Sequence, residues 1–286
     1  MSLYTEGFTD AADGLQLYSR DYHGAGAGKL PVLCLAGLTR NTRDFEDIAA
    51  HMATTRRVVA MDTRGRGRST YDPKWENYSI PMEAGDVLAV LGALNIPKAI
   101  VLGTSRGGLI ATVLAAMKPD VLGGAILNDV GPEIDPRGIA RIASYVGVVT
   151  APPQTWDDAM TRAKQINGDM FDMPDSDWMR MTRASYREEG GKPVLDYDLK
   201  IGDATRAQMA QPQQFDPWML FGAYAKIPLL VVRGANSDLL SAETVAKMHG
   251  VKPDMKSVDV PGRGHAPLLN EPQSIAAIDA FLADLP

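Results

Sequence analysis

Short apolar runs that alternate with helical patterns place the strongest constraint on how this chain can fold. The runs cover residues 31–37, 57–62, 99–103, 124–130, 228–234 and 256–262. Apolar runs this short are typical of buried parallel strands, because helices cover both faces of a parallel sheet. The alternation therefore predicts an α/β protein with a mostly parallel sheet and helices on both faces.

Helical stripes fill the intervals between these runs. Three of them comprise Phe45, Ile48, Ala49 and Met52 with Thr42 as N-cap, Val87, Val90, Leu91 and Leu94 between Pro81 and Pro97, and Leu109, Val113 and Ala116 ended by Pro119. The other two are residues 241–248, capped by Ser241, and Ile275, Ile278 and Leu282. A turn near residues 12–14 predicts a hairpin at the start of the chain. With the hairpin included, the sheet is expected to have about eight strands.

Residues 132–226 interrupt the alternation and contain no comparable strand run. They hold three of the four tryptophans and seven of the fourteen methionines. We interpret them as a helical cap, or lid, inserted after the sixth strand into a core domain of residues 1–131 and 227–286. The Trp and Met side chains could line an adaptable apolar cavity or serve as ordinary packing between helices.

Composition excludes several classes of protein. The formal charge of −6 gives no overall attraction to nucleic acid or to an anionic membrane. No stretch approaches the roughly 18 apolar residues of a membrane span, and residues 1–14 lack the apolar segment of a secretory signal. Cys34, the only cysteine, lies in an apolar run and is expected to be a buried small hydrophobe. A cytoplasmic protein is expected.

The pentapeptide at residues 103–107, Gly-Thr-Ser-Arg-Gly, matches the G-x-S-x-G motif with Ser105 at its centre. At ordinary Gly and Ser frequencies, about one chain in ten of this length contains the pattern by chance. Its context is more specific, since a strand run enters the motif and an apolar helix leaves it, as a nucleophile elbow requires. A glycine-rich turn with an incidental serine is the alternative interpretation.

On this motif and its context, the chain resembles the α/β-hydrolase family, in its serine, esterase-like branch with a helical cap. The family's chain order of nucleophile, acid and histidine implies a triad of Ser105, Asp238 and His265. Asp238 and His265 both follow strand runs, at the sheet edge where such proteins bind ligands. Asp129, after the run at residues 124–130, is the alternative acid, or else a structural hydrogen-bond acceptor.

The resemblance also implies that the backbone N–H groups of Leu38 and Arg106 form an oxyanion hole. The chain departs from the common pattern here, with Ala36 before Gly37 where many relatives carry His-Gly, and with an arginine directly after the nucleophile. The Arg106 side chain could pair with a buried carboxylate, face solvent or bind an anionic substrate group.

Residues 61–69 resemble a loop shared by esterases, epoxide hydrolases and C–C bond hydrolases, and we interpret this loop as a structural brace. Its arginines at positions 64, 66 and 68 are expected to be solvated or ion-paired, with a ligand site as the alternative. A serine at the nucleophile position argues against epoxide hydrolases and haloalkane dehalogenases, which use aspartate.

The implied reaction is acyl transfer, and the expected function is hydrolysis of a small apolar carboxylic ester through an acyl-enzyme. No cofactor and no metal are expected, because the sequence shows neither a His-rich or paired-Cys cluster nor a G-x-G-x-x-G after a strand. A small-molecule substrate is the expected partner, with no nucleic acid and no membrane. C–C bond, lactone or amide hydrolysis, acyl transfer, and a non-catalytic ligand-binding receptor remain alternatives, and the oligomeric state is left open.

Overall fold

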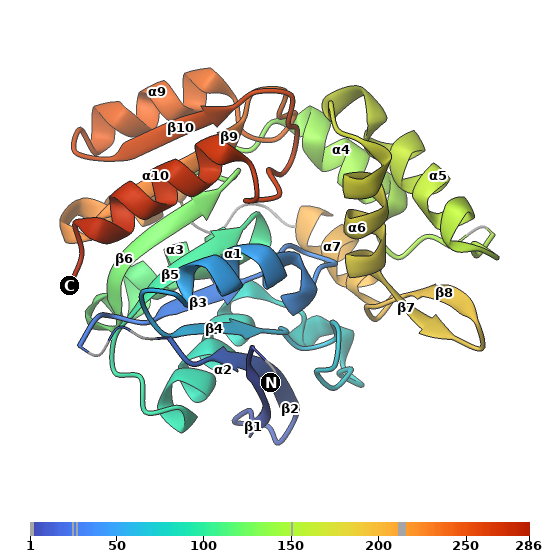
Figure 1. Ribbon diagram of the computed structural model, residues 1–286, viewed down its shortest axis with the longest axis horizontal. Coiled ribbons are helices and arrows are strands. Elements are labelled where there is room, and N and C mark those ends of the chain that lie inside the picture. Colours follow the sequence, from blue (N-terminus) through green and yellow to red (C-terminus); the bar gives the residue numbers. More distant parts are fainter. Residues whose placement is uncertain (1–2, 25, 27, 150, 211–215) are drawn as a thin grey trace.

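A computed structural model describes residues 3–24, 26, 28–149, 151–210 and 216–286. It contains an eight-stranded sheet in the order β1-β2-β4-β3-β5-β6-β9-β10 (Figure 1). The strands are β1 (Thr5–Asp10), β2 (Gln16–Tyr22), β3 (Val32–Leu35), β4 (Val58–Met61), β5 (Ala99–Thr104), β6 (Leu122–Asn128), β9 (Leu229–Gly234) and β10 (Lys256–Val260). The predicted α/β architecture and the number of strands are confirmed.

The six strands β3, β4, β5, β6, β9 and β10 run parallel to one another, whereas β2 pairs with β1 and β4 in antiparallel fashion. The pair β1 and β2 is the hairpin predicted at the start of the chain. All residues of β3 and β4 are buried, which explains why their sequences are continuously apolar. Cys34 lies fully buried in β3, as predicted, and burial raises the pKa of its thiol.

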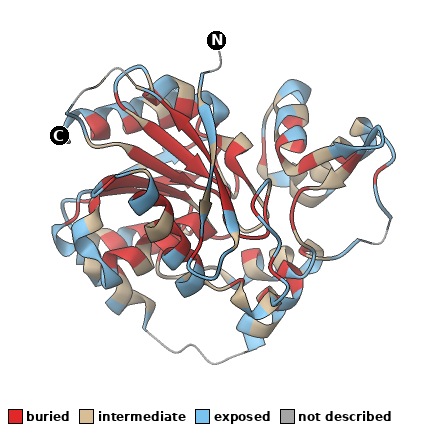
Figure 2. Ribbon diagram, turned by 90° about the horizontal axis from the view of Figure 1, so that it is seen from below, coloured by how far each residue is buried: buried red, intermediate tan, exposed pale blue. Residues whose placement is uncertain are grey.

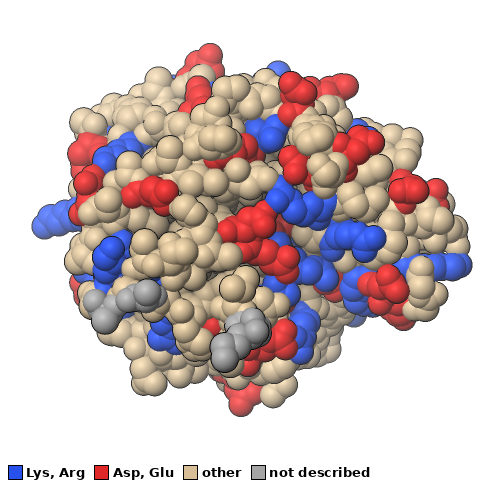
Figure 3. Space-filling model, viewed as in Figure 1, with Lys and Arg blue, Asp and Glu red and all other residues tan. Residues whose placement is uncertain are grey.

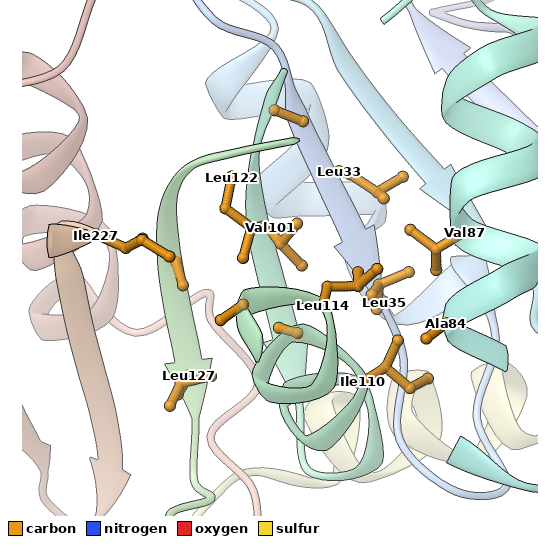
Figure 4. Close-up of a cluster of buried hydrophobic side chains, with 14 of the residues drawn as sticks. Leu33, Leu35, Ala84, Val87, Val101, Ile110, Leu114, Leu122, Leu127 and Ile227 are labelled. Atoms are coloured by element: carbon orange, nitrogen blue, oxygen red, sulfur yellow. The ribbon is translucent and has the colours of Figure 1, made fainter. Parts of the chain in front are cut away.

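Helices cover both faces of the sheet, and two hydrophobic clusters lie beneath them. The helices are α1 (Glu46–Met52), α2 (Ile80–Ala93), α3 (Arg106–Met117), α9 (Ala242–Val251) and α10 (Pro272–Ala283). The larger cluster joins α2 and α3 to the sheet, with Val87, Ile110 and Leu114 against Leu33 and Val101 (Figure 4). The second cluster lies under α1 and α10. Figure 2 shows the central strands as buried and the outer faces of the helices as exposed.

Two details of the helices differ from the sequence predictions. The side chain of Asn41, not Thr42, caps the turn before α1 by accepting from the Arg43 N–H. In α3 the buried apolar side chains are Ile110, Ala111, Leu114 and Ala115, whereas the predicted stripe comprises Leu109, Val113 and Ala116. Leu109 and Val113 are only partly buried, and Ala116 is exposed. The predicted cap at Ser241 is confirmed, because its hydroxyl accepts from the N–H of Thr244 in the first turn of α9.

The insertion, residues 132–226, follows the sixth strand as predicted. It contains α4 (Pro136–Tyr145), α5 (Trp156–Asn167), α6 (Asp175–Ser185), α7 (Ile201–Ala210) and α8 (Pro217–Phe221), with residues 150 and 211–215 outside the described part. It is not purely helical, since β7 (Tyr186–Glu189) and β8 (Lys192–Leu195) form a hairpin. In Figure 1 α4 to α7 and this hairpin lie beside the sheet, past the ends of its central strands.

The last part of the insertion packs with the core. Phe221 and Tyr224 join the larger hydrophobic cluster and form T-shaped ring contacts, with Trp218 packed at its edge. The division of the chain into a core domain and a cap domain at residues 132 and 226 stays a prediction. No helix in the described ranges is long and apolar enough to cross a membrane.

Candidate active site

The turn between β5 and α3 carries Ser105 in a conformation that few residues adopt. Its φ of 51° and ψ of −113° lie outside the strand and helix regions, as is common for strained residues at functional sites. A β-carbon added at Gly103 would lie 2.4 Å from the carbonyl carbon of Gly107. One added at Gly107 would lie 2.1 Å from the carbonyl oxygen of Leu35. The motif glycines therefore allow strand and helix to approach closely enough to form the elbow.

His265 lies in the loop after β10 and contacts Ser105, as predicted. Its Nε2 lies 2.8 Å from the Ser105 Oγ, and its Nδ1 lies 2.7 Å from an oxygen of Asp129. The histidine side chain is 8% exposed and the aspartate side chain is fully buried. With Nδ1–H donating to the carboxylate, Nε2 is left to accept the hydrogen bond of the serine hydroxyl.

Asp129 directly follows β6 and is fixed by two further donors. The N–H of Gly234 donates to one carboxylate oxygen at 2.8 Å, and the Ser237 hydroxyl donates to the other at 2.6 Å. Three hydrogen bonds, from Gly234, Ser237 and His265, thus fix the orientation of this buried carboxylate. Sequence reasoning missed Ser237, although it lies in the same loop as the predicted acid.

The prediction that Asp238 is the partner of His265 is wrong. The Asp238 carboxylate forms a two-point ion pair with Arg141 of α4, at 2.6 and 2.9 Å. Burial raises the pKa of Asp238, but the hydrogen bonds and charge of Arg141 outweigh it and hold the pKa below its usual value. Asp238 thus connects the loop after β9 to the insertion, and the alternative acid, Asp129, takes the place beside the histidine.

The backbone N–H groups of Leu38 and Arg106 donate to no acceptor among the described residues. The turn that carries Leu38 lies beside the nucleophile, because a β-carbon added at Gly37 would lie 3.8 Å from the Ser105 Cβ. Arg106 is the first residue of α3, where backbone N–H groups favour negative charge. Both free donors are therefore available to a ligand atom at Ser105.

The Arg106 side chain pairs with a buried carboxylate, the first of its three predicted possibilities. Its Nε lies 2.6 Å from Glu83, which is fully buried in α2. Glu83 also contacts Arg66 at 2.7 Å, and Arg66 donates to the Leu38 carbonyl oxygen at 2.8 Å. Burial raises the pKa of Glu83, but both guanidinium groups outweigh it, so the pKa is lowered. One carboxylate thus connects the two residues whose N–H groups are free.

The loop at residues 61–69 is ion-paired, as its interpretation as a brace predicts. Arg64 is buried and contacts Asp86 at 2.6 Å and Asp72 at 2.8 Å. Arg68 is half exposed and pairs with Glu6. None of the three loop arginines lines the cavity beside Ser105.

A cavity of about 620 Å³ opens beside Ser105 and His265. The insertion supplies apolar side chains to its wall, namely Ile142, Ile166, Phe171, Met179, Met181 and Leu195. The three tryptophans of the insertion do not line it, and Trp178 instead packs edge-on against Phe171. Over the part of the chain that the structure describes, no group of three or more His, Cys, Asp or Glu side chains is placed to hold a metal ion.

The serine lies at a strand–helix elbow and is hydrogen-bonded to a histidine, which in turn contacts a buried aspartate. On a sheet of this topology, this arrangement defines a hydrolase of the α/β class. Comparison with known proteins agrees. The family model of the alpha/beta hydrolase fold matches residues 31–272, and the chain belongs to this family.

Three relatives show how far the similarity extends. An alpha/beta hydrolase of known structure from Novosphingobium aromaticivorans is 41% identical, with a TM-score of 0.93 and 99% of each chain covered. A 3-hydroxybutyrate-oligomer hydrolase from Cupriavidus necator is 32% identical over 96% of each chain. A 2-(acetamidomethylene)succinate hydrolase from Mesorhizobium japonicum is 29% identical over 84% of this chain and 82% of its own. The protein is a hydrolase.

Proposed function

We propose that this hydrolase cleaves carboxylic esters through an acyl-enzyme, with Ser105 as nucleophile, His265 as general base and Asp129 as the acid. The observation that carries the proposal is the continuous hydrogen-bonded chain from Ser105 through His265 to Asp129, open to a cavity of about 620 Å³. A serine hydroxyl is a weak nucleophile until an adjacent base accepts its proton, and this geometry supplies that base.

In the proposed cycle, His265 Nε2 takes the Ser105 proton while the serine oxygen attacks the carbonyl carbon of the ester. The N–H groups of Leu38 and Arg106 hold the negative oxygen of the tetrahedral intermediate. The intermediate then collapses, and His265 returns the proton to the departing alcohol. A water molecule, deprotonated by the same histidine, hydrolyses the acyl-enzyme and restores the serine. Asp129 keeps the histidine in the correct tautomer and stabilises its charged form.

The ester class has support from the cavity and from one relative. The apolar walls suit the hydrocarbon part of an ester, and a few polar groups meet at Ser105 to orient it. The Cupriavidus necator relative is named for hydrolysis of oligomers of a hydroxy acid, whose units are joined by ester bonds.

Amide hydrolysis is the second candidate. The Mesorhizobium japonicum relative is named for a substrate that contains an acetamido group. The same triad attacks either carbonyl, so the fold does not decide between the two reactions.

A panel of p-nitrophenyl esters of increasing acyl length tests the ester proposal, run beside p-nitroanilides of the same acids. Enzymatic turnover of the short and medium esters that is lost in Ser105→Ala is the expected result. Turnover of the anilides alone would favour the amide reaction. Ester turnover equal in the wild type and in Ser105→Ala would contradict the proposal.

A further inference from the structure

The wall of the cavity is rich in arginine, which an apolar ester does not require. Arg40, Arg43, Arg162, Arg180 and Arg183 line it, against only three acidic residues, Asp44, Glu46 and Asp47. The whole chain has the opposite balance, with a formal charge of −6. Figure 3 shows basic side chains gathered near α6, where the insertion faces the core. Arginine side chains are therefore concentrated at the cavity.

Three of these arginines are neutralised by carboxylates. Arg40 pairs with Asp44, Arg43 with Asp196, and Arg180 with both Asp47 and Asp177. Arg162 and Arg183 form no ion pair with any described residue, and their contacts are of other kinds. Arg183 lies over the Trp156 ring at 4.4 Å and is exposed, whereas Arg162 is half-buried and donates one hydrogen bond to the carbonyl oxygen of Ala151. Arg162 thus keeps an uncompensated charge and free donors beside the cavity.

Polar neighbours of Arg162 continue toward the nucleophile. Tyr186 lines the cavity, and burial raises the pKa of its hydroxyl. The nearby positive charges of Arg162 and Arg40 act in the opposite direction. The Cγ of Arg40 lies 3.4 Å from the site of a β-carbon added at Gly37, and that site is 3.8 Å from the Ser105 Cβ. Arg40 also donates to the Ser185 hydroxyl at the end of α6. A polar side of the cavity thus extends from the serine to α5.

We propose that Arg162, supported by Arg40 and the Tyr186 hydroxyl, forms a carboxylate subsite, so that the preferred substrate is an ester that carries a free carboxylate. This inference rests on the proposed ester hydrolysis at Ser105 and specifies its substrate class. A guanidinium with free N–H groups in a partly buried place binds a carboxylate through charge-assisted hydrogen bonds. The apolar residues of the insertion contact the chain between the two ends of such a substrate.

The test compares two esters of equal acyl length, mono-p-nitrophenyl adipate and p-nitrophenyl hexanoate, with spontaneous hydrolysis subtracted. The wild type is expected to show the higher kcat/KM on the adipate ester. Arg162→Gln should lower kcat/KM on that ester by about tenfold or more, since hydrogen bonds to a charged group are lost. The same variant should leave hexanoate turnover within about twofold. Arg162→Lys, which keeps the charge, should retain part of the preference.

Arg180→Gln is the matched control, because Arg180 also lines the cavity but its charge is already neutralised. It should leave the ratio of the two esters unchanged. An equal kcat/KM for both esters in the wild type, or a preference that survives in Arg162→Gln, would overturn the subsite.

Calorimetric binding of monoethyl adipate to Ser105→Ala measures the same subsite without turnover. Adding Arg162→Gln to Ser105→Ala should weaken this binding about tenfold, and that result supports the subsite even if the wild type hydrolyses no ester. A lack of ester hydrolysis would contradict only the proposed reaction. Binding of equal strength in both proteins would overturn the subsite.

Discussion

The identity of the acid beside His265 is decided by single side chains. Asp129 and Asp238 both follow strands of the parallel sheet, so both lie at the edge where the strands end. Sequence spacing cannot separate them, because it does not show where each carboxylate points. Asp129 points to the histidine and is held there by Gly234 and Ser237, whereas Asp238 turns to Arg141.

Replacing each aspartate with asparagine in turn measures how much each carboxylate contributes to kcat. Asp129→Asn is expected to lower kcat by about 10⁴-fold, the loss seen for the matching change in a serine protease, since the amide favours the wrong histidine tautomer. Asp238→Asn should keep kcat within about tenfold, because it weakens only the ion pair with Arg141. Thermal melting checks that both variants fold. A larger loss in Asp238→Asn than in Asp129→Asn would refute the assignment of Asp129.

Glu83 provides a second prediction at this scale, because it connects Arg66 to Arg106 behind the two free backbone donors. Glu83→Gln keeps the shape but removes the charge that holds both guanidinium groups. We expect a loss in kcat of about tenfold or more with little change in KM, since removal of one oxyanion donor costs about 10² to 10³.

Asp86→Asn is the control for Glu83→Gln. Asp86 is also buried in α2 and pairs with Arg64, whose guanidinium forms no hydrogen bond with Leu38 or Arg106. Both variants should melt at lower temperature, because each leaves a buried arginine less well compensated. Only Glu83→Gln should reduce kcat in the fraction that remains folded. Equal kcat values in the two variants would contradict the link between Glu83 and the oxyanion donors.

Among the elements, the close packing of β5 against α3 depends on glycine. Gly103→Ala would place a methyl group 2.4 Å from the backbone of α3, and the overpacking should cost about 2 kcal/mol or more. Gly85→Ala is the control, since Gly85 is exposed in α2 with no atom within 4 Å of an added β-carbon. It should stabilise the protein by up to about 1 kcal/mol. Calorimetric melting temperatures should move in opposite directions, and a higher melting temperature for Gly103→Ala would contradict the packing.

Sequence patterns predicted the central strands because burial on both faces makes their residues continuously apolar. They predicted the helices of the core because each buries one apolar stripe. The same reasoning missed β7 and β8, whose four-residue sequences include Arg187, Glu188, Glu189 and Lys192 and are partly exposed. A two-stranded hairpin at the surface needs no apolar run, so its sequence resembles a loop. Ser105 was predictable because a local turn requires a local motif, whereas the histidine–acid pair depends on the folding of distant loops.

At the scale of the whole molecule, ion pairs and hydrogen bonds connect the insertion to the core around the cavity. Arg141 pairs with Asp238, Arg43 pairs with Asp196, and the Asn41 side chain donates to the Ala184 carbonyl at 3.0 Å. These contacts join the loops that follow the strands to α4, α6 and the segment after β8. The cavity therefore depends on both parts of the chain, and residues of the insertion should control which acyl groups fit.

Ile166→Trp tests this control over acyl length. Ile166 lies in α5 and lines the cavity, so the larger side chain should reduce the space available to the acyl group. We expect kcat/KM on octanoate esters to fall about tenfold while turnover of acetate esters changes little. Ile275 is half-buried in α10 and does not line the cavity, so it is the control position for the same substitution in stability measurements. An unchanged ratio of octanoate to acetate turnover would contradict the cavity wall formed by the insertion.

The central claim is that Ser105 is a nucleophile activated by His265, and mass spectrometry of the protein after reaction with a fluorophosphonate measures this most directly. The account predicts a single covalent adduct that peptide mapping places on Ser105, no adduct in Ser105→Ala, and labelling slowed by at least about a hundredfold in His265→Ala. An adduct that forms on another residue, or that persists in folded Ser105→Ala, would contradict it.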